Sequence, residues 1–454
     1  MTAPDDLRGG DRPHRLPGPA AASAWVLAYV ALVAFPLLLL LVGPIPRGGG
    51  WAWDFAMALG FAGLALMGLQ FVLSARFRRL AAPFGIDLIY FFHRWAAILG
   101  FALIVGHYLV LKLAYPESLG PLDPRYAPGH YTAGRIALLL FALVIATSWW
   151  RQPLRLPYDL WRITHGLLSV AAIAASVVHV HGVGYYTTAP WKAVLWLAYS
   201  LAWLLVLVHL RLVRPWRLQR HPYDVVDVRA ERGSAWTLTL RPRTGTALRF
   251  HPGQFAWLSL GTSPFRAREH PFSFAGSAED RTGLRFTIKE LGDFTRTVGR
   301  TAPGTVAYVD GPYGAFTVDR FPDAPGFVFI AGGVGIAPMV SMVRTLADRG
   351  DRRPLVLIYG SSTWERTLLR EELAALAARL PLQVVHVLQT PPAGWTGEVG
   401  FITEEVLRRA LPAAATEWPC FLCGPKAMTD FVIPSLRRLG FPLRRLHTEL
   451  FAMA

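Results

Sequence analysis

Four histidines in this sequence have the spacing of metal ligands. His93 and His107 lie in one apolar stretch and His165 and His179 in another, with 14 residues between the members of each pair. On a helix, 14 residues rise about 21 Å and return to within about 40° of the same face. Imidazole is a good ligand for iron, so two such helices side by side would suit two stacked haems, each held from both sides.

The elements that must position these histidines are apolar runs long enough to cross a membrane. A spanning helix needs about 20 apolar residues, and six runs of that kind precede residue 215: 21–42, 53–73, 88–111, 131–150, 163–183 and 191–212. The histidine pairs fall in the third and fifth runs, which cross in the same direction. Ionisable side chains inside a span are costly and usually functional, so we expect all four to bind haem iron.

Neighbouring residues leave two alternatives open. His181 competes with His179 for the outer haem, although on an ideal helix it would lie about 160° away from the direction of His165. Arg94 and Arg162, beside the inner pair, would either bind haem propionates or anchor the spans at the membrane surface.

Composition and charge agree with a membrane protein. Apolar residues make up 53% of the 454 and charged residues 17%, which excludes a purely soluble or a disordered chain. The net charge of +16 arises largely from arginines in the connections after the second, fourth and sixth runs. By the positive-inside rule this predicts cytoplasmic termini and no nucleic-acid partner. Residues 1–20, rich in Pro, Gly and Arg, are expected to be disordered.

The sequence after residue 215 predicts two further domains. Short alternating segments over 218–322 indicate an antiparallel β-barrel. Over 323–454, strands alternate with helices, and Phe327 to Ala331 runs into a Gly-rich turn, Gly332-Gly333-Val334-Gly335, where backbone N–H groups can approach a pyrophosphate at a helix N-terminus. This half is therefore expected to be a doubly wound parallel sheet. Cys420 and Cys423 supply only two of the four ligands that zinc usually takes.

Several short motifs carry a family resemblance. They are His251-Pro-Gly-Gln-Phe255, His270-Pro-Phe-Ser-Phe274, Lys289-Glu-Leu-Gly-Asp-Phe-Thr295, Gly311-Pro-Tyr-Gly314 and Phe421-Leu-Cys-Gly-Pro425, together with Asp87 and His93-Arg94 and with Tyr158-Asp-Leu-Trp-Arg162 in the membrane half. In order and spacing the soluble half resembles the ferredoxin–NADP reductase superfamily. The whole chain, apart from the first 20 residues, resembles the NADPH oxidases and ferric reductases.

The resemblance implies roles for individual residues. The expected FAD-binding residues are His270, Pro271, Phe272, Ser273, Lys289, Gly292 and Thr295, with Ser273 near the isoalloxazine. The expected NAD(P)-binding residues are Gly332, Gly333, Gly335, Pro338, Cys423, Gly424 and Pro425. Ser273, Cys423 and a C-terminal aromatic, Phe451, would surround the reacting rings.

One departure from the family pattern affects the electron donor. Relatives often carry an arginine for the 2′-phosphate after the second strand, where this chain has Tyr359-Gly360-Ser361-Ser362. A serine cannot make the bidentate contact of arginine. Arg366 or Arg370 might substitute, and Glu365 would oppose a phosphate. NADPH is only slightly favoured over NADH.

The expected function is a transmembrane oxidoreductase. Electrons would pass from cytoplasmic NAD(P)H through FAD and two bis-histidine b-type haems to an acceptor outside the inner or plasma membrane. The leading acceptor is dioxygen, giving superoxide or H2O2. Ferric-chelate reduction for iron uptake is the close alternative, and a module that supplies electrons to an extracytoplasmic partner protein is a third hypothesis.

Overall fold

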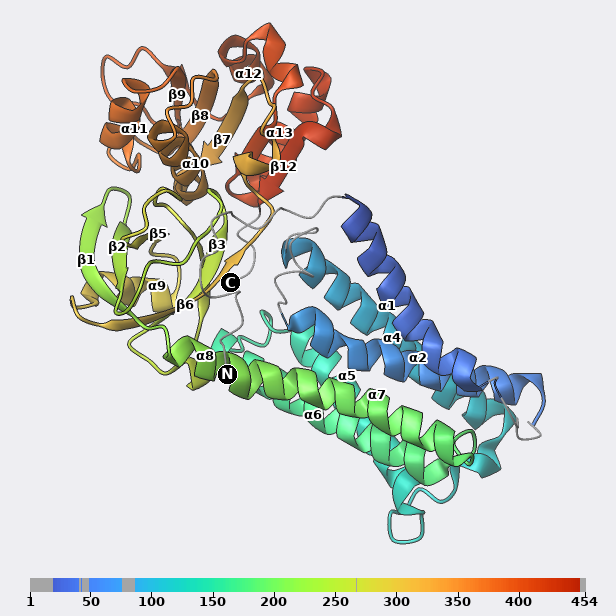
Figure 1. Ribbon diagram of the computed structural model, residues 1–454. Coiled ribbons are helices and arrows are strands. Elements are labelled where there is room, and N and C mark those ends of the chain that lie inside the picture. The colour runs from blue at the N-terminus through green and yellow to red at the C-terminus, as the bar shows by residue number, and fades with distance from the viewer. Residues whose placement is uncertain (1–18, 41, 43–48, 76–85, 267, 450–454) are drawn as a thin grey trace. The chain divides into compact units, whose positions relative to one another are not determined.

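The computed structural model describes residues 19–40, 42, 49–75, 86–266 and 268–449 (Figure 1). These residues divide into two compact units, one made of residues 19–75 and 88–214 and the other of residues 215–449. Residues 1–18, where disorder was expected, and Phe451 lie outside the described residues.

The first unit is helical. Among the described residues, six helices are long and apolar enough to cross a membrane, which confirms the six expected runs. They are α1 Pro19–Leu40, α2 Trp51–Ser74, α4 Ile86–Ala114, α5 Gly129–Trp149, α6 Tyr158–Val183 and α7 Pro190–Val208. Large apolar side chains such as Leu113 (83% exposed) and Leu139 (64% exposed) point outward, as a lipid-facing surface requires.

Small residues let these helices approach one another closely. A Cβ on Gly63 of α2 would lie 2.9 Å from the Gly100 carbonyl oxygen of α4, and one on Gly68 would lie 2.1 Å from the Trp203 ring of α7. Small residues at such contacts are typical of helix packing in membranes, where dispersion contacts replace the hydrophobic effect. The core between the helices includes Phe61, Leu64, Met67, Phe141, Ile173, Trp196 and Trp203.

The sixth membrane helix changes its geometry at one end. After Val208 the chain forms a π-helical turn, His209–Val213, and then continues as α8 Arg214–Gln219. A π turn adds one residue per turn and so rotates the side chains that follow.

The second unit begins with an antiparallel sheet. Its strands are β1 Tyr223–Glu231, β2 Ala235–Pro242, β3 Phe255–Leu260, β4 His270–Ser273, β5 Leu284–Lys289 and β6 Val306–Tyr313, in the order β4-β3-β6-β1-β2-β5. A bridge between Phe274 and Phe286 joins the two edges, so the sheet closes as the sequence predicted. A short helix, α9 Asp293–Thr297, precedes β6.

A parallel sheet follows, in the order β10-β9-β8-β7-β11-β12. The strands are β7 Phe327–Gly332, β8 Leu355–Ser361, β9 Leu382–Leu388, β10 Glu398–Val399, β11 Cys420–Cys423 and β12 Leu446–Glu449, and the helices are α10 Ile336–Asp348, α11 Arg370–Ala377, α12 Glu404–Ala410 and α13 Lys426–Arg438. Phe327 and Phe329 join one hydrophobic core while Val328 and Ile330 join another. Both faces of the sheet are therefore covered, as in a doubly wound fold.

Candidate functional sites

The two histidines of the inner pair face each other from two neighbouring membrane helices. His93 of α4 and His165 of α6 have ring centroids 6.4 Å apart, with an angle of 58° between the ring planes. The two side chains come from residues 72 positions apart in the sequence. The structure thus brings together one of the two pairs that the spacing predicted.

A serine on a third helix orients one ring of this pair. Ser148 of α5 donates its hydroxyl hydrogen to the Val144 carbonyl (2.6 Å) and lies 3.1 Å from His165 Nδ1. Because the only hydroxyl hydrogen is already used, Ser148 Oγ accepts from His165 and the proton sits on Nδ1. The Nε2 lone pair of His165 is then available to a metal. His93 Nδ1 is buried and has no hydrogen-bond partner among the residues that the structure describes.

Backbone carbonyls orient the outer pair in the same way. His107 Nδ1 lies 2.8 Å from the Ala56 oxygen of α2, and His179 Nδ1 lies 2.9 Å from the His130 oxygen of α5. A carbonyl can only accept, so both Nδ1 atoms carry the proton and both Nε2 atoms keep a lone pair. His181 has no such contact in the described part of the chain, and its Nε2 is buried without a partner.

Glycines on neighbouring helices make room for the outer rings. A Cβ on Gly60 would lie 3.0 Å from His107 Nδ1, and one on Gly134 would lie 2.7 Å from His179 Nδ1. Real Cβ atoms almost never approach a neighbour that closely, so a larger residue at either position would displace the ring.

An arginine near the inner pair escaped the sequence reading. Arg211, in the π-helical turn, places Nη2 only 2.9 Å from the point where a Cβ on Gly166 would be. Gly166 directly follows His165 on α6, and successive side chains of a helix point about 100° apart, so Arg211 packs against α6 next to the His165 backbone. The π turn, which no sequence pattern announced, rotates Arg211 to this position.

Three of the short motifs in the soluble half meet on adjacent strands. Phe255 of β3 pairs with Ser273 of β4 on one side and with Tyr313 of β6 on the other. Gln254 donates to the Gly314 carbonyl (2.9 Å), which joins the first motif to the last. Ser273 is 5% exposed, and its hydroxyl has no hydrogen-bond partner among the described residues.

The other expected flavin residues lie on the same barrel. The His270 ring stacks on Phe294 at 4.0 Å, and Lys289 ends β5. The Thr295 hydroxyl accepts from the N–H groups of Leu291 and Gly292, each at 2.8 Å, and so closes its own turn. Thr295 is one of the expected FAD-binding residues, and in the structure its hydroxyl also shapes the turn that begins α9.

The expected dinucleotide residues converge where the order of the parallel strands reverses. A Cβ on Gly335 would lie 2.2 Å from the Cys423 carbonyl oxygen, and one on Gly424 would lie 2.4 Å from Met428 Cε. The loops after β7 and β11 therefore touch through glycine. Gly333 has φ +55°, with open space on its Cβ side within the described structure. Pro338 lies in the first turn of α10 and Pro425 caps α13, positions that need no N–H donor.

A buried tyrosine holds the Gly-rich turn in place through a hydrogen bond. The Tyr359 hydroxyl donates to the Gly333 carbonyl (3.1 Å) and accepts from the Leu368 N–H (3.2 Å). Burial raises the pKa of Tyr359, so the phenol stays protonated and keeps donating. Burial also raises the pKa of the Cys420 thiol, which makes that cysteine a packing residue.

An acidic residue near the C-terminus was missed by the sequence analysis. Glu449 ends β12, pairs in register with Cys423 and is 6% exposed. Its Oε1 lies 3.4 Å from the position of a Cβ on Gly314. It thus reaches from the parallel sheet to the barrel. An acidic residue two positions before Phe451 was the available signal.

The loop after β8 engages its own arginine. The Arg370 guanidinium lies 4.4 Å from the Trp364 ring centroid, donates to the Trp364 carbonyl (2.8 Å) and pairs with Glu371 (2.9 Å). Hydrogen bonds from Arg370 and Arg232 lower the pKa of Glu371 to about 2. Arg370, the first residue of α11, is therefore held by contacts with its own neighbours Trp364 and Glu371.

Comparisons with known proteins match both halves of the chain. Residues 59–176 match the family model of the ferric reductase-like transmembrane component, and residues 329–433 match that of the oxidoreductase NAD-binding domain. The soluble half also has curated relatives. NADH-cytochrome b5 reductase 1 of Candida albicans is 31% identical over 255 residues, which cover 54% of this chain and 85% of that protein.

Two further similarities cover less or are more distant. NADH-cytochrome b5 reductase 1 of Pyricularia oryzae is 36% identical over 170 residues, 36% of this chain and 54% of its own length. The chain thus spans only about half of that relative. Among solved structures, the flavohem-like FAD/NAD binding domain of nitric oxide dioxygenase from Vibrio cholerae is 21% identical, with a TM-score of 0.46, and the match covers 51% of this chain and 98% of the other.

Proposed function

Because this chain belongs to the NADPH oxidase and ferric reductase family, in which a ferric reductase-like transmembrane component is joined to an oxidoreductase module for FAD and NAD, we propose that it carries electrons across a membrane. The donor is a cytoplasmic reduced nicotinamide, and the route runs through FAD and two haems to an acceptor on the other side. Bound FAD would take up a hydride and deliver single electrons, which haem iron requires.

His93 and His165 hold the inner haem in this proposal, and His107 and His179 hold the outer one. The observation that carries the proposal is the orientation of the rings: three of the four donate Nδ1–H to an oxygen and keep Nε2 for a metal. The spacing of the inner pair also fits. With metal–nitrogen bonds of about 2 Å, imidazoles on opposite sides of one iron have centroids roughly 6 Å apart, and the observed distance is 6.4 Å.

The barrel residues fit a flavin. The unpartnered, buried hydroxyl of Ser273 gives a hydrogen-bonding group to the edge of the isoalloxazine, and His270 and Lys289 supply polar groups toward the rest of FAD. Glu449 and Cys423 approach the same place from the parallel sheet. A buried carboxyl there can hold a proton close to the reacting rings.

The dinucleotide residues fit a pyrophosphate. The open backbone at Gly333 and the start of α10 present N–H groups without side chains in the way. We infer that NADH is the preferred donor. Arg370 is committed to Trp364 and Glu371, Glu365 lies in the same loop, and the curated relatives named above are NADH-dependent reductases.

The proposed acceptor is dioxygen, with ferric chelates as the alternative that the ferric reductase-like family model brings in. His107 and His179 would hold the outer haem, and that haem would supply single electrons to the acceptor. The chain is placed in the inner or plasma membrane with both termini cytoplasmic, because arginines gather in the connections on one side.

The test is anaerobic reduction of the detergent-purified, FAD-loaded chain by NADH, with NADPH in parallel. Low-spin b-type haem bands should appear with two haems per chain. His93→Ala and His179→Ala should each lose one haem, while His181→Ala should keep both. Protein that purifies without haem, or whose haem stays oxidised while flavin is reduced, would overturn the haem assignment.

Admitting oxygen or ferric citrate to the reduced protein then identifies the acceptor. Rapid reoxidation by oxygen with superoxide release supports the leading hypothesis. Reoxidation only by ferric citrate supports iron reduction. No turnover with either would favour a dedicated extracytoplasmic partner protein.

A further inference from the structure

Helix α10 packs apolar side chains such as Met339 and Val343 into the core of the parallel-sheet domain, and it also buries polar side chains. Its polar face consists of Ser341, Arg344 and Thr345, and Arg349, directly after the last residue of the helix, extends it. Ser341 and Thr345 are 0% exposed and Arg344 is 7% exposed. Buried polar groups need hydrogen-bond partners, and each of these residues has a partner in the flavin-type barrel.

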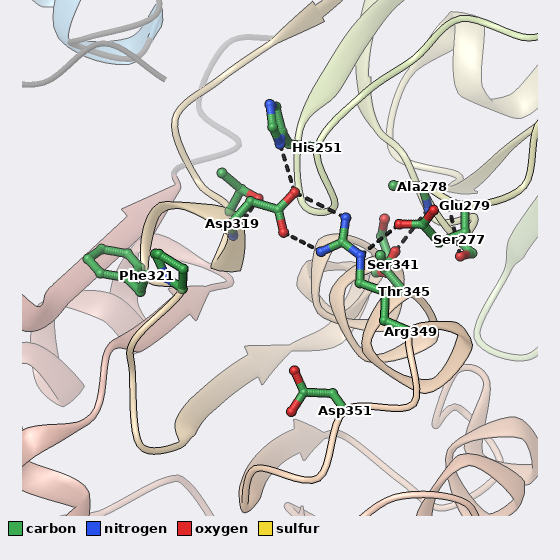
Figure 2. Close-up of polar contacts among 12 residues, drawn as sticks. His251, Ser277, Ala278, Glu279, Asp319, Phe321, Ser341, Thr345, Arg349 and Asp351 are labelled. Atoms are coloured by element: carbon green, nitrogen blue, oxygen red, sulfur yellow. Dashed lines mark hydrogen bonds and ion pairs between the residues drawn. The ribbon is translucent and has the colours of Figure 1, made fainter. Parts of the chain in front are cut away.

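The two hydroxyls of this face hold the segment that follows the flavin motif. Ser341 Oγ donates to the Gly276 carbonyl (2.7 Å). Thr345 Oγ1 accepts from the Ala278 N–H (2.9 Å), and both of these residues are labelled in Figure 2. Gly276 is only three residues beyond Ser273 of β4. The backbone that leaves the flavin motif is therefore fixed directly to α10.

Arg344 adds a charged anchor between these two contacts. Its guanidinium donates to the Ala275 carbonyl and forms a bidentate pair with Glu372 of α11. Charge-assisted bidentate pairs are the most directional hydrogen bonds in proteins. The pair with Glu372 fixes the orientation of the Arg344 guanidinium, which also donates to the Ala275 carbonyl of the barrel.

At the C-terminal end of α10, the carboxylate of Asp319 links Arg349 to His251; we call this cluster the Asp319 node. Arg349 donates to Glu279 (2.6 Å) and to Asp319 (2.5 Å), and Asp319 Oδ2 lies 2.7 Å from His251 Nδ1 (Figure 2). Burial alone would raise the pKa of Asp319, but hydrogen bonds from His251 and Arg349 outweigh it and keep that pKa below its usual value. Asp319 is thus an anion that joins the barrel motif at His251 to the end of α10.

The N-terminus of the same helix follows the dinucleotide turn, Gly332–Gly335. One rigid rod of 13 residues therefore connects the nicotinamide dinucleotide site to the backbone beside the flavin motif. We propose that the polar face of α10 is a positioning surface that sets the distance between the nicotinamide ring and the flavin. This inference rests on the proposed hydride transfer from nicotinamide to flavin.

The test uses the full chain, loaded with FAD and haem, and anaerobic stopped-flow reduction by NADH. Ser341→Ala with Thr345→Val, and separately Arg349→Gln, should slow flavin reduction at saturating NADH. Because a displacement of about 1 Å can cost about 100-fold in rate, we expect a loss of roughly 10- to 100-fold. The apparent Kd for NADH and the FAD content should stay within about twofold of the wild type, and the long-wavelength charge-transfer absorbance of the nicotinamide–flavin complex should weaken. Arg349→Lys, which keeps the charge, should recover part of the rate.

The matched control is Arg409→Gln. Arg409 forms a bidentate pair with Glu398 (3.0 and 2.6 Å) wholly within the parallel-sheet domain, so its loss removes a similar interaction without touching the barrel. Flavin reduction that is unchanged in the α10 variants, or slowed as much by Arg409→Gln, overturns the positioning role. If the wild type itself takes no hydride from NADH or NADPH, the proposed function fails instead. Should the buried double variant not fold, the surface-accessible Arg349→Gln variant decides the question.

Discussion

His93 and His165 face each other across α4 and α6 with their ring centroids 6.4 Å apart. Ser148 on α5 fixes the His165 tautomer, because its hydroxyl hydrogen is already bound by the Val144 carbonyl. The inner site thus depends on three helices, of which two supply the paired histidines and the third supplies Ser148.

Removing the Ser148 hydroxyl should weaken the inner haem site while both histidines remain. In Ser148→Ala the His165 ring loses its orienting acceptor, and loss of such a partner typically costs about 10- to 100-fold in metal affinity. Haem retention in a dilution series and the inner-haem midpoint potential measure the effect. Ser176→Ala is the control, because Ser176 is buried on α6 but bonds only its own helix at the Ala172 carbonyl (2.8 Å). Equal haem loss in both variants would contradict the prediction.

A single methyl group at Gly134 should damage the outer site. Its carbon would lie 2.7 Å from His179 Nδ1, so the ring must turn away and lose its bond to the His130 carbonyl. We expect Gly134→Ala to bind about one haem per chain instead of two, as read by the pyridine haemochrome assay. Gly129→Ala, at the start of the same helix, has open space at its Cβ position within the described structure and should keep both haems. Two haems in both variants would argue against His179 as the ligand.

Ser273→Ala should slow flavin reduction while it leaves the thermal stability of the protein almost unchanged. The hydroxyl has no partner among the described residues, so removing it leaves no protein group unpaired and should change the Tm of the flavin-free protein by little. If Ser273 bonds the flavin during hydride transfer, the loss of one such bond, about 1.4–2.7 kcal/mol, slows flavin reduction roughly 10- to 100-fold. Stopped-flow reduction of the FAD-loaded protein and thermal unfolding of the flavin-free protein make the comparison. A large fall in Tm with an unchanged rate would assign Ser273 a packing role.

The Asp319 node should lose its contribution to stability only in acid. Its pKa is lowered in the folded protein from 3.8, so the stabilisation is complete above about pH 5 and disappears as the pH falls through the folded pKa. At pH 7 the free energy of unfolding of the wild type should exceed that of Asp319→Asn by about 1 kcal/mol, which corresponds to roughly 2–4 °C in Tm. The two unfolding curves should begin to converge as the pH falls below about 4 and coincide once the pH lies below the lowered pKa of Asp319. A difference that persists at the lowest pH would mean that the carboxylate charge is not the source.

Much of the fold followed from the sequence because the signals are local. Span length identified α1 to α7, and the Gly-rich turn after Phe327–Ala331 identified the start of α10. The histidine spacing led to the prediction of paired haem ligands for the same reason, since helix geometry converts a count of 14 residues into a shared face.

What the sequence could not provide depends on contacts between distant segments. Nothing in the local pattern marks Ser148 as the partner of His165, or places Glu449 beside Cys423 through the pairing of β12 with β11. The π turn rotates Arg211 toward Gly166 without a compositional signature. The polar residues of α10 read as a solvated face until the barrel is packed against them.

The attachment of α10 to residues 275–278 also bears on how this chain can vary in length. Ala275 N bonds the Arg285 carbonyl (2.8 Å), Phe274 bridges Phe286, and the next carbonyls and amides go to α10. One inserted residue between Ser273 and Glu279 would exchange inward and outward groups and break every one of these bonds at once. The exposed turn at 391–394, by contrast, lies between β9 and β10 of one domain, so an inserted residue there would leave all of these bonds intact.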